Sequence, residues 1–124
     1  MTQFSRRFLL CAIAYVTAGM FFGIFMGGTQ DFTLAPVHAH MNLIGWATMG
    51  LFSFYYNAVP KAGETRLAQV HFWVSQAGLI AIIPGLSMVL SGNMSGEPVL
   101  IVGEILTALS MLMFAYTVYR NKAA

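Results

Sequence analysis

The feature that most constrains this chain is a run of 21 residues, 8–28, that contains no charged side chain. A helix of about 20 apolar residues crosses the roughly 30 Å hydrocarbon core of a bilayer. Of the 124 residues, 58% are hydrophobic and only 8% are charged, whereas a soluble domain carries about 25% charged residues. This composition excludes a soluble enzyme, a nucleic-acid-binding domain and a disordered tail, and it predicts an integral membrane protein.

We expect an all-α fold in which residues 1–124 form one transmembrane four-helix bundle. Pro36 and Pro98 suit the first turns of two spans, because a proline there loses no helical hydrogen bond. Pro84, followed by Gly85, predicts a kink in the third span. The first apolar run is too long for the 7–15 or so residues of a signal-peptide core, so we interpret it as a retained anchor. The expected spans are residues 8–28, 36–59, 67–90 and 98–119.

All six basic residues fall on one side of the expected spans. Because positive charge is retained on the cytoplasmic side, both termini are expected to be cytoplasmic, in a bacterial inner membrane. The two other loops contain no lysine or arginine. The basic residues are Arg6, Arg7, Lys61, Arg66, Arg120 and Lys122.

Glycines predict where the helices approach each other closely. Gly19, Gly23 and Gly27 recur every four residues in the first span, as a doubled GxxxG stripe. Such stripes allow two backbones to come together in a membrane. Gly78 and Gly85 are candidates for the same role in the third span.

Few ionisable groups lie at membrane depth, and groups of this kind usually face a partner, a cavity or a cofactor. His38 and His40 are expected roughly 3–6 Å below the outer end of their span, and Glu104 roughly 9 Å below the same face. These three residues therefore share one level. His71 lies near the inner face instead.

The spacing of His38 and His40 places them roughly 200° apart around a helix, so they are expected to serve two different sites. Neutral imidazole is a common metal ligand and an axial ligand of haem iron. Trp46 and the neighbouring apolar side chains would supply flat walls for a porphyrin. The alternative is that both histidines bond water in the headgroup region. Cys11 is the only cysteine, so an intrachain disulfide or a thiolate metal cage is excluded.

Residues 36–46, Pro-Val-His-Ala-His-Met-Asn-Leu-Ile-Gly-Trp, resemble a histidine-bearing helix of subunit I of the haem-copper oxidases. The cbb3-type and nitric-oxide-reductase branches are the most similar. In that family one helix carries a haem-ligating histidine near the outer face in a similar context, and another carries a His-x-His pair that ligates two different haems. The resemblance implies that His38 and His40 bind haem b.

A complete subunit of that family has about twelve spans in three similar arcs, so this chain resembles one arc. Three copies would rebuild the plan with true symmetry, and we expect a homotrimer in the lipid bilayer with haem between subunits. His38 of one copy and His40 of its neighbour would approach the same haem. The family's adjacent His-His copper ligands have no counterpart here, which favours electron transfer with a redox partner, or binding of a diatomic gas. Whether the chain is an enzyme and whether copper also binds stay open.

Three further residues have alternative roles. Glu104 is expected to accept the ring N–H of a ligating histidine, or else to be a protonated or snorkelling side chain. His71 is expected to bond headgroups, Glu64 or Arg66 at the helix end, with a second, inner cofactor as the alternative. Met41 is a candidate axial ligand.

Two other functions stay open. A small four-span proton-coupled transporter would use Glu104 as its protonatable carboxylate, although the strong charge bias argues against a transporter that inserts in both orientations. An assembly or structural subunit of a larger oxidase would dock through the glycines of the first span.

Overall fold

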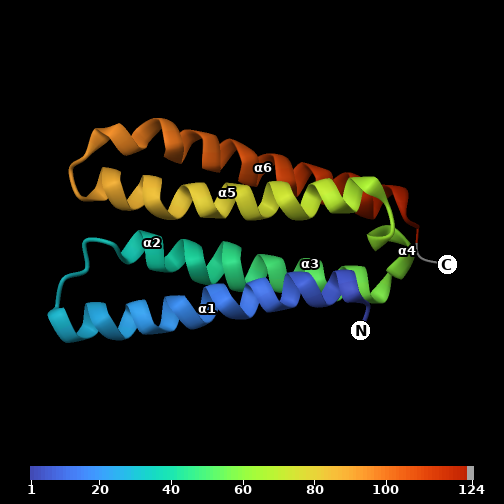
Figure 1. Ribbon diagram of the computed structural model, residues 1–124, viewed down its shortest axis with the longest axis horizontal. Helices are drawn as coiled ribbons and strands as arrows, with labels where there is room; N and C mark the ends of the chain where they lie inside the picture. The colour runs from blue at the N-terminus through green and yellow to red at the C-terminus, as the bar shows by residue number, and fades with distance from the viewer. Residues whose placement is uncertain (123–124) are drawn as a thin grey trace.

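The computed structural model describes residues 1–122, which are helical throughout with short connections and no strand. Figure 1 shows two helical hairpins side by side, one from residues 3–58 and the other from residues 66–120. The all-α prediction is confirmed. In chain order the elements are α1 (Gln3–Thr29), α2 (Ala35–His40), the π-helix η1 (Met41–Thr48), α3 (Met49–Ala58), α4 (Pro60–Gly63), α5 (Arg66–Leu90), the 3₁₀ turn η2 (Met94–Gly96) and α6 (Glu97–Arg120).

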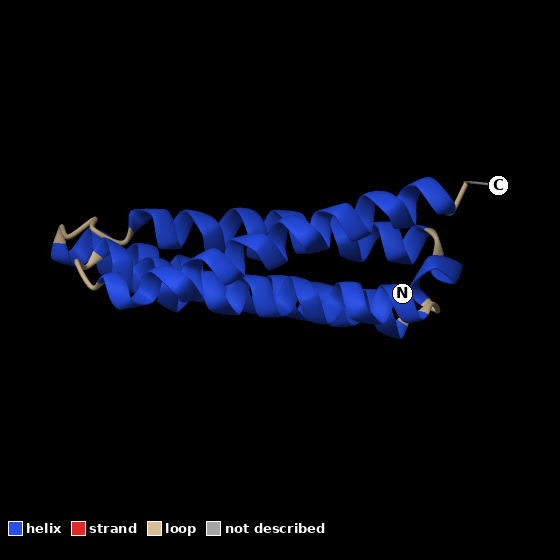
Figure 2. Ribbon diagram, turned by 90° about the horizontal axis from the view of Figure 1, so that it is seen from above, coloured by secondary structure: helices blue, strands red, loops and turns tan. Residues whose placement is uncertain are grey.

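Three helices are long and apolar enough to cross a membrane: α1, α5 and the segment Met94–Arg120, which contains α6. They correspond to the first, third and fourth expected spans. The second expected span is a succession of α2, η1 and α3, which follow one another without a break and run beside α1 (Figure 1). Figure 2 shows the described residues as helices joined by short loops. The helical backbone of this segment was predicted, but its π-helical middle was not.

Local sequence signals explain where the long helices begin and end. The Thr2 hydroxyl caps α1 by accepting a hydrogen bond from Ser5 N at 3.1 Å, and the Thr65 hydroxyl caps α5 through Ala68 N at 3.1 Å. Helix α1 ends at Gln30, which has a left-handed φ of 56°. Helix α5 continues through Pro84 to Leu90, so this proline does not end the helix.

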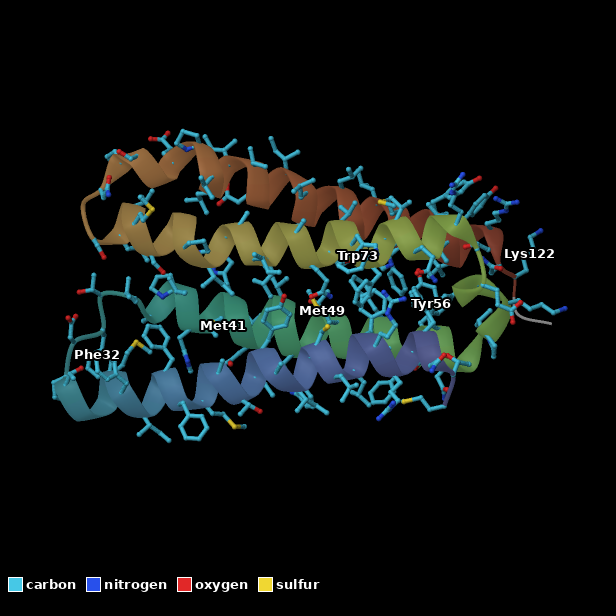
Figure 3. All side chains as sticks on the ribbon, viewed as in Figure 1. Phe32, Met41, Met49, Tyr56, Trp73 and Lys122 are labelled. Atoms are coloured by element: carbon cyan, nitrogen blue, oxygen red, sulfur yellow. The ribbon has the colours of Figure 1, made fainter. Side chains whose placement is uncertain are left out.

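The two ends of the bundle differ in charge. We call residues 1–7, 60–66 and 120–122 the basic end, because they contain all six basic residues. Both termini and α4 lie there, and Figure 3 places Lys122 at this end and Phe32 at the other. We call residues 29–35 and 91–98 the acidic end, because their charged residues are Asp31 and Glu97. Hydrogen bonds from the hydroxyl and backbone N–H of Thr33 lower the pKa of Asp31, which keeps this end negatively charged.

An aromatic core fills the half of the bundle nearest the basic end. Phe8 and Tyr56 are fully buried, and their rings stack with centroids 5.8 Å apart. Phe8 also meets Phe52 and Phe72 edge-on, at 5.6 Å and 4.9 Å. Edge-to-face pairs of this kind add to the packing energy of the buried rings. The aromatic core therefore joins α1, α3 and α5 into one unit.

Glycines mark the closest helix contacts, as predicted at four of five positions. Gly19 and Gly23 face Asn42 and His38 of the neighbouring rod, whereas Gly27 has nothing within 4 Å of the point where a Cβ would lie. The predicted stripe in α1 is therefore used over two glycines and not three. The confirmed close contacts between α5 and α6 are at Gly78, which lies against Gly103 and Thr107, and at Gly85, which lies against Leu100.

Candidate functional site

The π-helix η1 lies directly after the two histidines of α2. Its wider turn is visible in the Thr48 hydroxyl, which donates to the Leu43 carbonyl, five residues earlier, at 2.9 Å. Gly45 allows the close contact with α1, since a Cβ there would lie 2.5 Å from the Cβ of Tyr15. π-helical turns are rare and are often found at functional sites. The glycine was the only sequence signal for this feature.

The His38 side chain faces α1, within the first hairpin. Its Nδ1 lies 2.8 Å from the Gly19 carbonyl, which can only accept, so Nδ1 carries the proton. Its Nε2 then accepts from the Asn42 amide nitrogen at 3.2 Å. Both ring nitrogens of His38 are therefore engaged by groups of the same chain. Asn42 was missed as a partner, although its spacing of four residues from His38 places the two side chains on one helix face.

His40 points the other way. Its Nδ1 donates to the carbonyl of Pro36, one turn earlier, at 2.6 Å. In a neutral ring this bond leaves Nε2 unprotonated, with its lone pair available to a ligand. The prediction that the two histidines point in nearly opposite directions is confirmed: His38 faces α1, and His40 faces a cavity between the hairpins.

The cavity beside His40 has a volume of about 310 Å³ and lies between the rod of residues 35–58 and the pair α5–α6. We call it the central cavity. A smaller hollow of about 220 Å³ on the surface shares His40 and Ile44 with it. The walls are mostly apolar, with hydroxyl groups at intervals. The lining residues are His40, Ile44, Thr48, Met49, Phe52, Ser75, Ile82, Glu104, Thr107, Ala108, Ser110 and Met111.

Glu104 lines the central cavity together with His40, so the prediction that they share one level is confirmed. Its side chain is exposed on the bundle surface. The expectation that Glu104 accepts the ring N–H of a ligating histidine is wrong for His40, because the Pro36 carbonyl takes that proton. Glu104 instead places a carboxylate at the mouth of the cavity.

Two other residues lie away from the cavity. Trp46, expected to form a wall of the histidine site, lies in a groove with Leu9 and Phe54 on another face of the rod, and its side chain is 43% exposed. Met41 is buried against Gly19. Neither residue lines the central cavity.

His71 is not at the headgroups, and the expectation that it bonds lipid, Glu64 or Arg66 is wrong. Its side chain is fully buried, and its Nδ1 lies 2.9 Å from the Tyr56 hydroxyl. The ring stacks on Phe114 at 5.7 Å and meets Phe52 edge-on at 4.6 Å. Its Nε2 is buried without a hydrogen-bond partner among residues 1–122.

Within residues 1–122, no group of three or more histidine, cysteine, aspartate or glutamate side chains could hold a metal ion. A closed copper or zinc cage is therefore not formed by one copy of this part of the chain. Haem iron needs only one or two axial ligands from the protein, because the porphyrin fills the other positions.

No protein-family model matches the chain, and no curated protein or solved structure matches it either. The resemblance of residues 36–46 to the haem-copper oxidases thus stays a prediction from the sequence.

Proposed function

We propose that this chain is a multi-pass membrane protein that binds haem b through Nε2 of His40, at the mouth of the central cavity. The observation that carries the proposal is the 2.6 Å hydrogen bond from His40 Nδ1 to the Pro36 carbonyl. Histidines that ligate metals commonly donate their second ring nitrogen to such an acceptor, which fixes the tautomer and raises ligand basicity. His40 is thus oriented as a ligand by its own helix.

The surroundings of His40 also fit a porphyrin. Ile44, Met49, Ile82 and Met111 provide apolar walls in the central cavity. Small-molecule sites commonly measure roughly 300–1000 Å³, so 310 Å³ is at the low end of that range. A macrocycle would therefore also extend over the surface hollow that His40 and Ile44 share with the cavity.

His38 fits a haem less well than His40. Its two nitrogens are engaged by Gly19 and Asn42, and its ring lies against Gly23. Ligation by His38 would require Asn42 to turn away from Nε2. We therefore assign His40 as the iron ligand and His38 as a residue that holds α2 against α1.

His40 would be the only iron ligand from this copy, so a haem held by it could also bind a diatomic gas or a ligand from another copy. A bound haem would supply one-electron redox chemistry at this position. The Glu104 carboxylate shares the cavity, and a nearby negative charge favours the ferric over the ferrous state. The proposed role is accordingly electron transfer or gas binding at a membrane haem.

The proposed arrangement in the membrane has four spans. The rod of residues 35–58 is about 35 Å long, enough to cross the hydrocarbon core beside the other three helices. The basic end would face the cytoplasm of a bacterial cell, with both termini inside. A homotrimer would cover the open side of the haem with a second copy, because an exposed ionisable group is costly in lipid.

The test is the absorption spectrum of the protein purified from haem-replete cells. We expect a Soret band and reduced-minus-oxidised b-type peaks, lost in His40→Ala and kept in the matched variant His38→Ala. Colourless wild-type protein, or full haem content in His40→Ala, would overturn the proposal.

Proton-coupled transport is the second candidate, and the observation that favours it is the exposure of Glu104 beside His40 on the same cavity. An ionisable residue at this depth is a common feature of proton pathways. Substrate-driven proton uptake into proteoliposomes would be abolished by Glu104→Gln and unaffected by Glu97→Gln at the acidic end. Proton uptake that survives Glu104→Gln would exclude this function.

A further inference from the structure

The deeper half of the central cavity is lined by hydroxyl groups from three helices. Thr48 comes from η1, Ser75 from α5, and Thr107 and Ser110 from α6. Ser75 and Ser110 satisfy their own hydrogens on backbone carbonyls, at 2.7 Å and 2.8 Å. The second lone pairs of these oxygens stay available to a hydrogen-bond donor.

Two buried polar atoms beside this region have no hydrogen-bond partner within residues 1–122: the hydroxyl oxygen of Thr107 and Nε2 of His71. Buried polar atoms are nearly always paired with protein or with ordered water, because leaving one unpaired costs about 1–3 kcal/mol. Thr107 lines the cavity directly. The Thr107 oxygen therefore indicates water in the cavity, and Nε2 of His71 is a second buried atom that lacks a partner.

His71 does not line the cavity, but it contacts two residues that do. Phe52 lines the cavity and meets the His71 ring edge-on at 4.6 Å. Ser75 also lines the cavity, and its hydroxyl donates to the His71 carbonyl at 2.7 Å. Phe52 and Ser75 thus connect His71 to the lining of the cavity.

The dimensions of the cavity suit a column of water. A volume of about 310 Å³ corresponds to roughly ten water molecules at their share of liquid volume, about 30 Å³ each. His40 and Phe52 are twelve positions apart on one helical rod, so the lining residues of the cavity extend over several helical turns.

The opposite side of His71 is closed by packed aromatic rings. Phe8 and Tyr56 are fully buried, and Phe114 stacks on His71 at 5.7 Å. The titratable or charged groups around His71 are Tyr56, which bonds Nδ1, Tyr55 next to it, and Arg7, which lies over the ring of Phe72 at 4.3 Å. No carboxylate is among these residues.

We propose that the central cavity is a one-sided, water-filled inlet that carries protons from the acidic end to His71, with Phe52 as its inner barrier. The ligand class is water and hydronium ion, and the terminal acceptor is the Nε2 atom of His71. A haem and the water would occupy the same cavity, so the inlet is proposed for the haem-free protein, where it uses the hydroxyl groups and not the ligand atom of His40.

Cysteine accessibility in sided proteoliposomes tests the inlet in the full chain without haem. Ser75→Cys, a nearly isosteric change in a Cys11→Ala background, is treated with a water-soluble, membrane-impermeant thiol reagent from either side. Only a thiol that can ionise in water reacts rapidly. We expect reaction from the acidic-end side at a rate roughly tenfold or more above that of Ile80→Cys, a control on the same helix. Ile80 is 59% exposed on the outer surface of the bundle.

Asn93→Cys, in the acidic-end loop, reports the sidedness of the vesicles. A Ser75→Cys thiol that is unreactive, or that reacts equally from the basic-end side, overturns the proposal. Ser110→Cys repeats the measurement from α6, in case Ser75→Cys fails to fold. Labelling that persists in a haem-free His40→Ala background separates failure of the haem proposal from failure of the inlet.

The end point of the inlet is tested by nuclear magnetic resonance of protein labelled with ¹⁵N-histidine. The chain has three histidines, and His71→Phe identifies the signal of the third. We expect an exchange cross-peak between water and the His71 ring nitrogen that is lost in Ser75→Val. A His71 ring without contact to water would show that Phe52 closes the cavity completely and that His71 is not the acceptor.

Discussion

Polar side chains in the two halves of this bundle have different surroundings: they are buried and hydrogen-bonded in one half, and they border a cavity in the other. Near the basic end, Ser5 and Ser53 exchange hydrogen bonds with each other's backbone carbonyls at 2.8 Å, and aromatic rings fill the space around them. Near the acidic end, His40 and Glu104 border a cavity, and the adjoining helix changes to a π-helix. One half therefore holds the bundle together, and the other has the open volume that a ligand requires.

His71 lies among the rings of the aromatic core and shows why burial alone does not identify function. It is as deeply buried as Phe8, and one of its nitrogens is bonded to Tyr56. Its second nitrogen has no partner among residues 1–122. If His71 only filled space, phenylalanine at this position would give a more stable fold, since a buried nitrogen without a hydrogen-bond partner is unfavourable.

The largest contrast is expected for truncation of large apolar side chains in each half. Phe8→Ala removes a ring that contacts five other aromatic rings and should lower the free energy of unfolding by about 3–5 kcal/mol. Ile44→Ala, beside existing open volume, should cost about 1 kcal/mol. Reversible unfolding in mixed micelles measures both. Equal losses would mean that the cavity half is packed as tightly as the aromatic core.

A smaller effect is expected where glycine allows α5 and α6 to touch. In Gly103→Ala the added Cβ would lie 2.8 Å from the Gly78 carbonyl oxygen and from Ile82 N, so the helices must separate, at a cost of about 1–3 kcal/mol. Gly27→Ala meets nothing within 4 Å and should be neutral or stabilise by up to about 1 kcal/mol. Thermal unfolding of both variants in detergent is the measurement. A destabilised Gly27→Ala variant would indicate a partner on that face of α1.

The two histidines of α2 should separate stability from ligand binding. His38→Ala breaks the bonds to Gly19 and Asn42 and should cost about 1–2 kcal/mol. His40→Ala should change stability by less than about 0.5 kcal/mol in haem-free protein, because its bond to Pro36 is local. Unfolding of haem-free protein tests both. A more destabilising His40→Ala would assign His40 a structural role.

The smallest effect is expected within the π-helix. Thr48→Val keeps the shape of the side chain but removes its hydrogen bond to the Leu43 carbonyl, which should cost about 0.5–1 kcal/mol. Hydrogen exchange of residues 41–48 should accelerate, whereas exchange in α3 should not change. Slower exchange would mean that the hydroxyl strains this turn and that an α-helix replaces it in the variant.

The helical fold was predictable because an uncharged run of about 20 residues is a strong signal that depends on no distant contact. The opposite directions of His38 and His40 followed from helix geometry alone, and both preceded the irregular turn. Trp46 lies within that turn, where five-residue hydrogen bonding changes which residues share a face. Trp46 was predicted on the wrong face of the helix because the α-helical period was extended into η1.

His71 was misplaced for a different reason. Its position five residues into α5 correctly predicts a place close to the helix end. Its surroundings come from Phe8, Tyr56 and Phe114 on three other helices, and no local pattern reports such contacts. The cavity could not be predicted from the sequence either, because hydroxyl residues such as Thr107 and Ser110 are ordinary in an apolar helix.

The reciprocal bonds between Ser5 and Ser53 also bear on how the two hairpins depend on each other. These bonds join α1 to α3 near the basic end of the first hairpin. They involve no residue after Ala58. The first hairpin therefore contains its own buried side-chain hydrogen bonds, which need no partner from α5 or α6. The aromatic core and the central cavity, in contrast, exist only where residues of both hairpins meet.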